Sequence, residues 1–434
     1  MAWGAVAVAG ALAVGARWLE EWRPPSPDRL TLLVFRVTTG ADNGPGSLRD
    51  AILAADRTTG RARVVVGVPR ILVETPLPPL VNPYGIVLEA EPAGAELEAS
   101  QVPGAVLDVA AAGSFVSDLR IQGGRAGVVI RARGVTLRNL HVAGTDTAVL
   151  IGDGADGATI VGTAFVRNRI GVQIAGSTGK ATVRNNRFED HGTAAVWAVA
   201  PQAPDSTLGT EVAIVGNRFQ NDAAGVVAVN VAARVERNVF DDQRGAAVHA
   251  SGARVALEGN RIRGGRGFGI YAEGVPSGFM SGNEIARNCS GGILLRHVGN
   301  TRVIGNQIYQ NGYGLVIMQS PAQSPNTVAD NLIADHMGDG IVLIAASPIL
   351  SRNRLLQNRL AGLRLSSMIA GRATDLAAAP LLTANIFQGN GHDDPQHDEY
   401  DPNTGATAPS QGLADCPWRL GTSVVYATQV GTAR

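Results

Sequence analysis

A short sequence unit recurs through most of this chain. Each unit consists of Asn-x-Ile or Asn-x-Phe, a polar turn, a Gly and an aliphatic run, as in Asn283 to Leu295 and Asn306 to Ile317. Most intervals between successive units are 21 to 25 residues, a period typical of stacked coils rather than of one closed core. The recurring residues are Asn139, Asn186, Asn217, Asn238, Asn260, Asn283, Asn306, Asn331, Asn353 and Asn385, with Thr163 in one unit.

The period predicts an all-β fold, a right-handed parallel β-helix. Three short strands and three turns fit into such a unit at roughly 3.3 Å per strand residue. We expect regular coils at 124–390 and irregular first coils at 35–123, with longer connections around 201–205 and 370–380. Asparagines at one corner of successive coils predict an internal amide ladder, which we favour over a catalytic role. The predicted core stack is Phe188, Phe219, Phe240, Ile262, Ile285, Ile308, Ile333, Leu355 and Phe387.

The first coil is predicted to be covered by a strand and a short helix. Phe35 to Thr39 alternates like a strand, and Ser47 with Asp50 has the spacing of a capping box. A solenoid needs such a cover because its end coil would otherwise leave strand edges open. The apolar face of the expected helix consists of Leu48, Ala51, Ile52 and Ala55.

The segment Asp42-Asn-Gly-Pro-Gly-Ser-Leu-Arg-Asp-Ala-Ile52 resembles the entry motif of exported bacterial right-handed β-helix proteins. That motif commonly reads Asp-x-Gly-x-Gly-Ser-Leu-Arg-x-Ala-Ile. The coils from about Phe35 to Phe387 are also similar to the β-helix repeats of carbohydrate-binding proteins and sugar hydrolases. The resemblance implies an exported protein with a carbohydrate ligand, although such repeats serve many functions.

The N-terminus favours export. Ala2 to Ala16 is an almost unbroken run of small and apolar residues, which is short for a membrane span of about 20 residues and suits a signal peptide. No Lys or Arg precedes the run, so a short anchor and the first helix of a cytoplasmic protein remain alternatives. We expect a signal peptide or anchor at 1–16 and a linker at 17–34. The protein is then secreted or periplasmic, and only an N-terminal anchor would contact a membrane.

Charge and cysteine content exclude several classes. The 37 basic and 37 acidic residues balance, so nucleic acid is not a predicted partner. Cys289 and Cys416 are the only cysteines, and their spacing argues against a zinc ribbon or a dithiol redox site. One disulfide between them and two separate thiols both remain open.

Two columns of outward residues are candidate binding surfaces. The column through the Gly-aliphatic segments contains aromatic and His side chains on which sugar rings could stack, or it is covered by a loop or partner. The column next to the ladder is partly basic and could bind carboxylates of an acidic polysaccharide, although a solvated face is the favoured interpretation. The candidate binding residues are Trp197, His249 and Tyr271 in the first column and Arg187, Arg218 and Arg261 in the second.

Catalytic residues are less well defined. A lyase or epimerase needs a base near a positive charge or a bound calcium ion, and a glycosidase needs clustered carboxylates. The candidates are Asp242 with His249, and Asp335 with His336 and Asp339. Asp242 and Asp335 fall at a position typical of turn formers. The same position of other repeats is expected to hold Asp190, Asn221, Asn288, Asn311 and Asn358. Whether the protein is an enzyme is therefore left open.

The segment 391–401 is acidic, with five carboxylates and two histidines. It could bind calcium, but a surface loop is favoured, and no metal site or cofactor is predicted. Residues 391–434 are expected to form this loop and a tail that caps the last coil. The leading hypothesis is an exported protein that binds an extended, acidic polysaccharide and could process it as a lyase, epimerase or hydrolase. The alternative is a non-catalytic scaffold or assembly factor that docks on a protein partner.

Overall fold

The structure is a computed structural model that describes residues 32–100, 102–176, 179–201, 209–366, 368–369, 372–373 and 378–397. The expected signal peptide, nearly all of the expected linker, residues 398–401 of the acidic segment and Cys416 lie outside the described residues. Within the described residues, no helix has the length and apolar character needed to cross a membrane.

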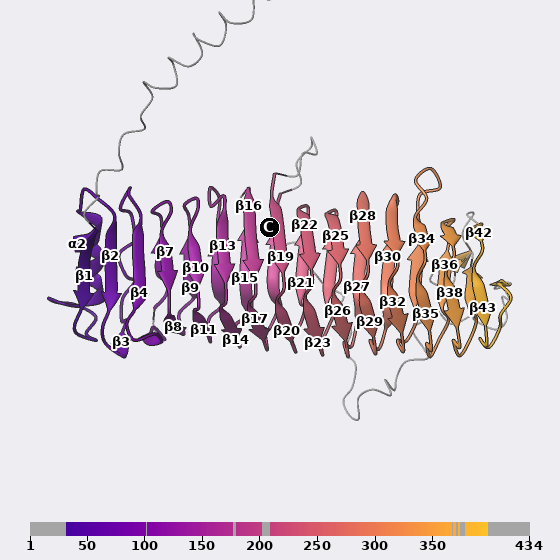
Figure 1. Cartoon of the computed structure of the whole chain (residues 1–434), viewed down its shortest axis with the longest axis horizontal. Coiled ribbons are helices and arrows are strands. Elements are labelled where there is room, and N and C mark those ends of the chain that lie inside the picture. The colour runs from indigo at the N-terminus through magenta and orange to yellow at the C-terminus, as the bar shows by residue number, and fades with distance from the viewer. Residues whose placement is uncertain are drawn as a thin grey trace, which may run out of the picture.

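Three long parallel sheets wind around one axis (Figure 1). Sheet A contains β1 (Leu33–Val37), β2 (Ala62–Val66), β4 (Ile86–Ala90), β7 (Phe115–Ser117), β10 (Thr136–Arg138), β13 (Ala158–Val161), β16 (Lys180–Arg184), β19 (Glu211–Val215), β22 (Ala232–Glu236), β25 (Arg254–Glu258), β28 (Ser277–Ser281), β31 (Thr301–Ile304), β34 (Thr327–Ala329), β37 (Ile349–Ser351) and β42 (Leu381–Thr383). Sheet B contains β3 (Arg70–Leu72), β5 (Ala95–Glu98), β8 (Leu119–Gln122), β11 (His141–Ala143), β14 (Ala164–Val166), β17 (Arg187–Glu189), β20 (Arg218–Gln220), β23 (Val239–Asp241), β26 (Arg261–Arg263), β29 (Glu284–Ala286), β32 (Gln307–Tyr309), β35 (Leu332–Ala334), β38 (Arg354–Leu356) and β43 (Ile386–Gln388).

Sheet C completes each coil. It contains β6 (Ala105–Val109), β9 (Ala126–Ile130), β12 (Thr147–Ile151), β15 (Ile170–Ala175), β18 (Ala194–Val199), β21 (Val226–Val229), β24 (Val248–Ser251), β27 (Phe268–Glu273), β30 (Gly291–Arg296), β33 (Leu315–Met318), β36 (Ile341–Ile344), β39 (Leu363–Ser366) and β44 (Gln396–His397). A separate antiparallel pair is formed by β40 (Met368–Ile369) and β41 (Arg372–Ala373). The chain passes from sheet A to B to C in each regular coil, so the predicted all-β parallel solenoid is confirmed.

The predicted asparagine ladder lies at the corner between sheets A and B. Each amide donates from Nδ2 to Oδ1 of the next, for example Asn283 to Asn306 at 2.9 Å and Asn306 to Asn331 at 3.0 Å. The ladder is continuous from Asn186 to Asn385. Buried amides are tolerated here because each also donates to a backbone carbonyl, as Asn283 does to Leu257 at 2.8 Å.

Asn139 is not a member of this ladder, contrary to the prediction. Strand register pairs His141 with Ala164, so Leu140 is the residue level with Thr163. Asn139 precedes it at a positive φ of 51° and donates to the Asp118 side chain instead. The predicted ladder position in this coil is one residue too early, because asparagine suits both the left-handed position and the inward position of this turn.

A second polar ladder lies at the corner between sheets B and C. Asn288 donates to Asn311 at 3.0 Å, and Asn358 donates to the Asn390 side chain at 2.7 Å. The predicted single turn position is wrong, because it merges two adjacent positions. The outer one has positive φ and includes Asp190, Asn221, Asp242, Arg287, Gln310, Asp335 and Gln357. The inner one is buried and includes His191, Asp222, Gln243, Asn288, Asn311, His336 and Asn358.

The core is a stack of apolar side chains inside the coils. Phe165, Phe188, Phe219 and Phe240 are fully buried, and their successive ring centroids lie 4.9, 4.9 and 4.4 Å apart. This spacing equals the distance between neighbouring strands, so identical residues on adjacent coils stack face to face. The predicted core column is confirmed from Phe188 to Leu355, and Phe387 packs against it while partly exposed.

The N-terminal cover has the predicted elements. The strand is β1, two residues earlier than expected, and the helix is α2 (Leu48–Asp56). Its buried face is Leu48, Ala51, Ile52 and Ala55, as predicted. The Ser47 side chain accepts from the Asp50 N–H at 3.2 Å, while the Asp50 carboxylate accepts from the Gly46 N–H, one residue before the position that a capping box uses.

Candidate functional site

The predicted outward column of sheet C is confirmed in its register. Trp197 pairs with Val227, Val227 with His249, and His249 with Tyr271. The His249 and Tyr271 rings stack, with centroids 4.8 Å apart and planes 12° apart. Trp197 does not join them, because Val227 lies between and is only 5% exposed.

The His249–Tyr271 pair is largely withdrawn from solvent. Burial lowers the pKa of His249, against an opposing effect of the Glu273 carboxylate. Tyr271 donates to the Glu273 carboxylate at 2.8 Å, and burial together with this hydrogen bond raises the pKa of Tyr271. The lowered pKa favours a neutral imidazole, which can accept a hydrogen bond from a ligand, and the raised pKa keeps the phenol protonated.

The second predicted catalytic group does not converge on one point. Asp335 occupies the outer turn position with φ of 56°. His336 follows it in the buried ladder, where its Nδ1 accepts from the Asn311 N–H at 3.1 Å. The Asp339 side chain is 3% exposed and binds the Arg364 guanidinium at 2.8 Å. These three residues are close in sequence, but their side chains belong to three different local structures.

In the first catalytic group, Asp242 is also at the outer turn position, with φ of 60°. His249 faces outward from the following strand of sheet C, where it stacks on Tyr271. A catalytic role for either residue stays a prediction.

The predicted basic column of sheet B is confirmed in register, and its charges are compensated. Arg187 binds Glu189 at 2.7 Å and Arg218 binds Asp241 at 2.9 Å. Arg261 lies 3.2 Å from the Glu284 carboxylate. Each arginine thus has a carboxylate partner, which Arg261 shares with Arg263, and this pairing reduces the field that the column presents to an anionic ligand.

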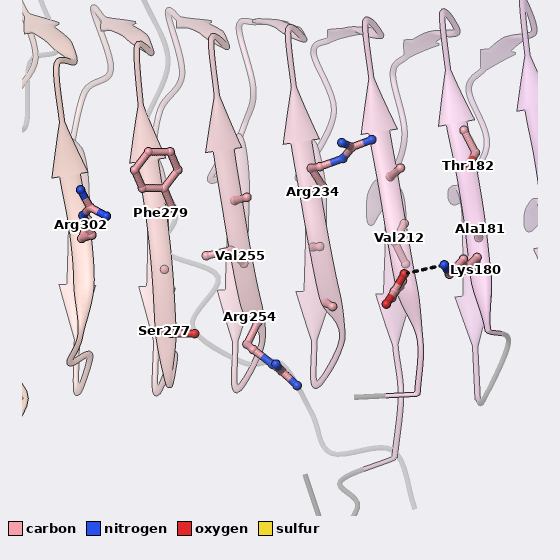
Figure 2. A pocket seen from close by; sticks show the side chains of 16 residues that line it. Lys180, Ala181, Thr182, Val212, Arg234, Arg254, Val255, Ser277, Phe279 and Arg302 are labelled. Atoms are coloured by element: carbon pink, nitrogen blue, oxygen red, sulfur yellow. Dashed lines mark ion pairs between the residues drawn. The ribbon is translucent and has the colours of Figure 1, made fainter. Parts of the chain in front are cut away.

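A hollow on the outer face of sheet A was not predicted. It is a shallow groove of about 840 Å³ that crosses the strands from β16 to β31 (Figure 2). Ala213, Ala256 and Gly278, which have little or no side chain, are among the residues that line it. Its charged and aromatic lining consists of Lys180, Glu211, Arg234, Arg254, Phe279 and Arg302.

The groove lining is predominantly basic. It contains four cations and one carboxylate, a difference of three positive charges. Lys180 lies 3.6 Å from Glu211, and their side chains are 74% and 60% exposed (Figure 2). Arg234 lies 3.2 Å from Glu236 at the edge of the groove. The Arg302 guanidinium lies 5.6 Å from the centroid of the Phe279 ring, which holds it by a cation–π contact. We call this surface the basic groove.

The basic groove was missed because only the columns of sheets B and C were aligned. Sheet A strands precede the ladder, and the fourth residue before each ladder asparagine points outward. That column is Thr182, Ala213, Arg234, Ala256, Phe279 and Arg302. The signal was therefore present in the sequence, at a fixed offset from a motif already recognised.

Within the described residues, no group of three or more His, Cys, Asp and Glu side chains has an arrangement suited to a metal ion. Only 391–397 of the acidic segment is described. There Asp393 accepts hydrogen bonds from the Asn390 N–H at 2.8 Å and the Gly389 N–H at 3.1 Å. These bonds lower the pKa of Asp393 and give its carboxylate a local role in the turn.

Comparison with known proteins agrees with this geometry. The family described as "Right handed beta helix region" matches residues 205–360. This chain is a right-handed β-helix. The sequence matches no curated protein, so the remaining comparisons are of folds.

Several solved β-helix structures resemble the chain. The catalytic unit of a thermostable α-1,3-glucanase from Streptomyces thermodiastaticus aligns with a TM-score of 0.55 and 14% identity, over 85% of this chain and 70% of that one. A mutant of the periplasmic alginate epimerase AlgG aligns with a TM-score of 0.44 and 14% identity, over 74% of this chain and 75% of that one. DFA-IIIase from Arthrobacter chlorophenolicus, without its lid, aligns with a TM-score of 0.47 and 13% identity, over 75% of this chain and 95% of that one. Identities this low indicate a shared fold alone.

Proposed function

We propose that this protein binds an extended anionic polysaccharide in the basic groove. The observation that carries the proposal is a group of three cations on sheet A: Arg234 and Arg302 share one outward column, and Arg254 lies two residues before that column on a coil between them. Neighbouring coils are about 4.8 Å apart, so the five steps from β16 to β31 cover roughly 24 Å. That length accommodates several sugar units of an extended chain.

The side chains of the basic groove are suited to bind carboxylate or sulfate groups of a ligand. An exposed guanidinium can form two parallel hydrogen bonds to such a group. The Phe279 ring supplies an apolar surface for a sugar face. The shared fold of the α-1,3-glucanase is consistent with a polysaccharide ligand, but the specificity for an acidic one rests on the groove.

Binding is proposed rather than bond cleavage. Glycoside hydrolysis ordinarily needs two carboxyl groups on either side of the scissile bond, and the groove lining contains one, Glu211. That one carboxylate is paired with Lys180 at 3.6 Å. The export of the protein and its 1–16 leader remain part of the proposal, since such polysaccharides lie outside the cytoplasm.

Isothermal titration calorimetry with a polyuronate of defined length would test this function. Arg254→Ala and Arg302→Ala are each expected to weaken binding roughly threefold to tenfold, the range for an exposed charge-assisted contact. Added salt should weaken binding of the unaltered protein because the cations are exposed. A neutral dextran of the same length should not compete.

The matched control removes two arginines from sheet B, as Arg187→Ala with Arg218→Ala. It lowers the positive charge by the same amount as the double variant Arg254→Ala with Arg302→Ala. Arg187 and Arg218 lie on another face and bind carboxylates of their own sheet, so binding should change less than twofold. An equal loss of affinity in both double variants would show that binding depends on net charge alone and not on the groove. Loss of binding in Trp197→Ala with Tyr271→Ala, and not in the groove variants, would move the site to sheet C and refute the proposal.

A further inference from the structure

The second polar ladder has one acidic residue among its described members, Asp222. Its side chain and that of His191 on the preceding coil are both fully buried. His191 Nδ1 lies 2.6 Å from Asp222 Oδ1, and the His191 N–H donates to the same oxygen at 3.0 Å. Asp222 Oδ1 therefore occupies the place of an amide oxygen in this ladder, such as that of Asn311, which also accepts from both the side chain and the backbone of the preceding member.

The second carboxyl oxygen of Asp222, Oδ2, is buried and has no hydrogen-bond partner among the described residues. In the asparagines of the ladder the corresponding atom is Nδ2, which donates to a backbone carbonyl of the preceding coil. The pairs are Asn168 with the Val142 carbonyl at 3.0 Å, Asn311 with that of Ile285 at 2.9 Å and Asn390 with that of Leu355 at 2.9 Å. Each of these carbonyls lies three residues before the preceding ladder member. For Asp222 the residue in this register is Phe188.

An ionised Asp222 would not fit this environment. A carboxylate only accepts hydrogen bonds, so Oδ2 would bring a second acceptor to the Phe188 carbonyl and both oxygens would lack a donor. A protonated carboxyl has an O–H group and can donate from Oδ2, as the amide Nδ2 does in the other coils. Protonation therefore restores the hydrogen-bonding pattern of the ladder and removes a buried charge.

A charged pair with an imidazolium at His191 would be less well satisfied. It requires a proton on His191 Nε2, which is buried and has no hydrogen-bond partner in the described part of the chain. The ring lies 5.8 Å from the Phe188 ring, and a Cβ atom at Gly171 would be only 2.9 Å from Nε2, so the surroundings of this nitrogen are already filled. The charged pair would leave both Nε2–H and Asp222 Oδ2 unpaired, whereas the neutral pair leaves only Nε2 unpaired.

We propose that Asp222 is a neutral carboxylic acid at pH 7, that it donates from Oδ2 to the Phe188 carbonyl, and that it makes the ladder sensitive to rising pH. The charged or titratable side chains that act on it are His191 and Arg244, on the coils before and after. Arg244 binds the His191 carbonyl and is exposed, so solvent screens its charge. Burial raises the pKa of Asp222, against opposing effects of both neighbours.

The sign of the pH dependence follows from this protonation. The folded pKa of Asp222 lies above the ordinary value of 3.8, so above pH 3.8 the folded chain keeps a proton that the unfolded chain releases. Stability therefore falls as the pH rises, until the folded pKa is passed. This effect is opposite in direction to that of a buried neutral histidine, and it does not depend on the proposed function.

Infrared difference spectroscopy of the intact protein at pH 7 tests the protonation state. Asp222→Asn is a suitable variant because asparagine is the commonest member of this ladder. The spectrum of the unaltered protein minus that of the variant should contain the C=O stretch of a protonated acid, at higher frequency than the amide bands. Asp242→Asn, at the exposed outer turn position of the next coil, should give carboxylate bands only. Carboxylate bands without the acid band for Asp222→Asn would overturn the proposal.

The pH sensitivity is tested by urea unfolding of the same proteins between pH 4 and pH 8. Asp222→Asn should be more stable than the unaltered protein, and the ratio of their folding constants should grow by up to about tenfold per pH unit until the folded pKa is passed. Asp242→Asn should show no such growth. A variant at Asp222 that is less stable than the unaltered protein at pH 8, or a ratio that does not change with pH, would refute the proposal.

Discussion

His336 should make the fold sensitive to acid. It is 2% exposed within the second polar ladder, where Nδ1 accepts from the Asn311 N–H and the backbone N–H donates to Asn358 Oδ1 at 3.3 Å. Burial lowers the pKa of His336 from 6.5 to about 3. At about 1.36 kcal/mol per pH unit, a shift of this size corresponds to roughly 5 kcal/mol.

The direction of the change in stability with pH follows from proton uptake by the unfolded chain. The folded pKa lies below the unfolded one, so between pH 6.5 and about 3 the unfolded chain binds a proton that the folded chain does not. Stability therefore rises with pH in this window. The contribution of His336 is fully present above pH 6.5 and is lost as the pH falls toward 3.

His336→Asn tests this reasoning, because Asn311 and Asn358 show that an amide fits the ladder. At pH 7.5 the variant should be less stable by about 1–2 kcal/mol, since the shorter side chain leaves a gap beside Gly314. At pH 4 it no longer loses the roughly 3 kcal/mol that protonation of the unfolded histidine costs the unaltered protein, so the order should reverse.

The assay is urea unfolding at both pH values, followed by far-UV circular dichroism. Comparison of the two proteins at each pH cancels the titration of other groups, including the buried His191–Asp222 pair. His297→Asn, at an exposed position, controls for removal of a histidine. If His336→Asn and the unaltered protein lose equal stability between pH 7.5 and pH 4, the proposed linkage is refuted.

Two further predictions concern the interior. Asn283→Ala should destabilise by about 2–4 kcal/mol, because the Leu257 carbonyl loses its buried donor and the preceding amide, Asn260, loses its buried acceptor; Gln307→Ala, on the outer face of the next coil, should change the urea midpoint little. Phe219→Ala should cost about 3–5 kcal/mol, since its ring contacts the Phe188 ring on one side and another aromatic ring on the other, and a urea midpoint unchanged by this substitution would contradict the stacked core.

The interior was predictable because each coil repeats the same inward constraints. An amide at the A–B corner must bond to its neighbours above and below, so the ladder residues recur at a readable period, and the apolar residue two positions later follows. The errors have the same origin. Asn139 and Asp242 occupy left-handed turn positions, where Asn and Asp are favoured for backbone reasons, one residue before the inward position that the periodic pattern describes.

The outward residues were harder to predict, because their register does not determine their surroundings. Arg218 is exposed but paired with Asp241 on the following coil, and Val316 faces outward but is only 5% exposed. Neither condition is visible in one column, since the first requires the neighbouring column and the second requires the larger apolar side chains that pack around Val316. Both can be reasoned from the sequence once the three sheets are aligned together.

The three faces of the solenoid differ in what already occupies them, and this difference locates the binding surface. The predicted arginines of sheet B are paired with carboxylates, so an anionic ligand would have to displace intramolecular partners. On sheet C, His249 and Tyr271 stack on each other, and the neighbouring outward valine Val227 is only 5% exposed, so this face offers a ligand little free ring surface. On sheet A, Arg302 has an aromatic neighbour instead of a carboxylate, which leaves its hydrogen-bond donors directed to solvent. A ligand therefore gains most, and displaces least, in the basic groove.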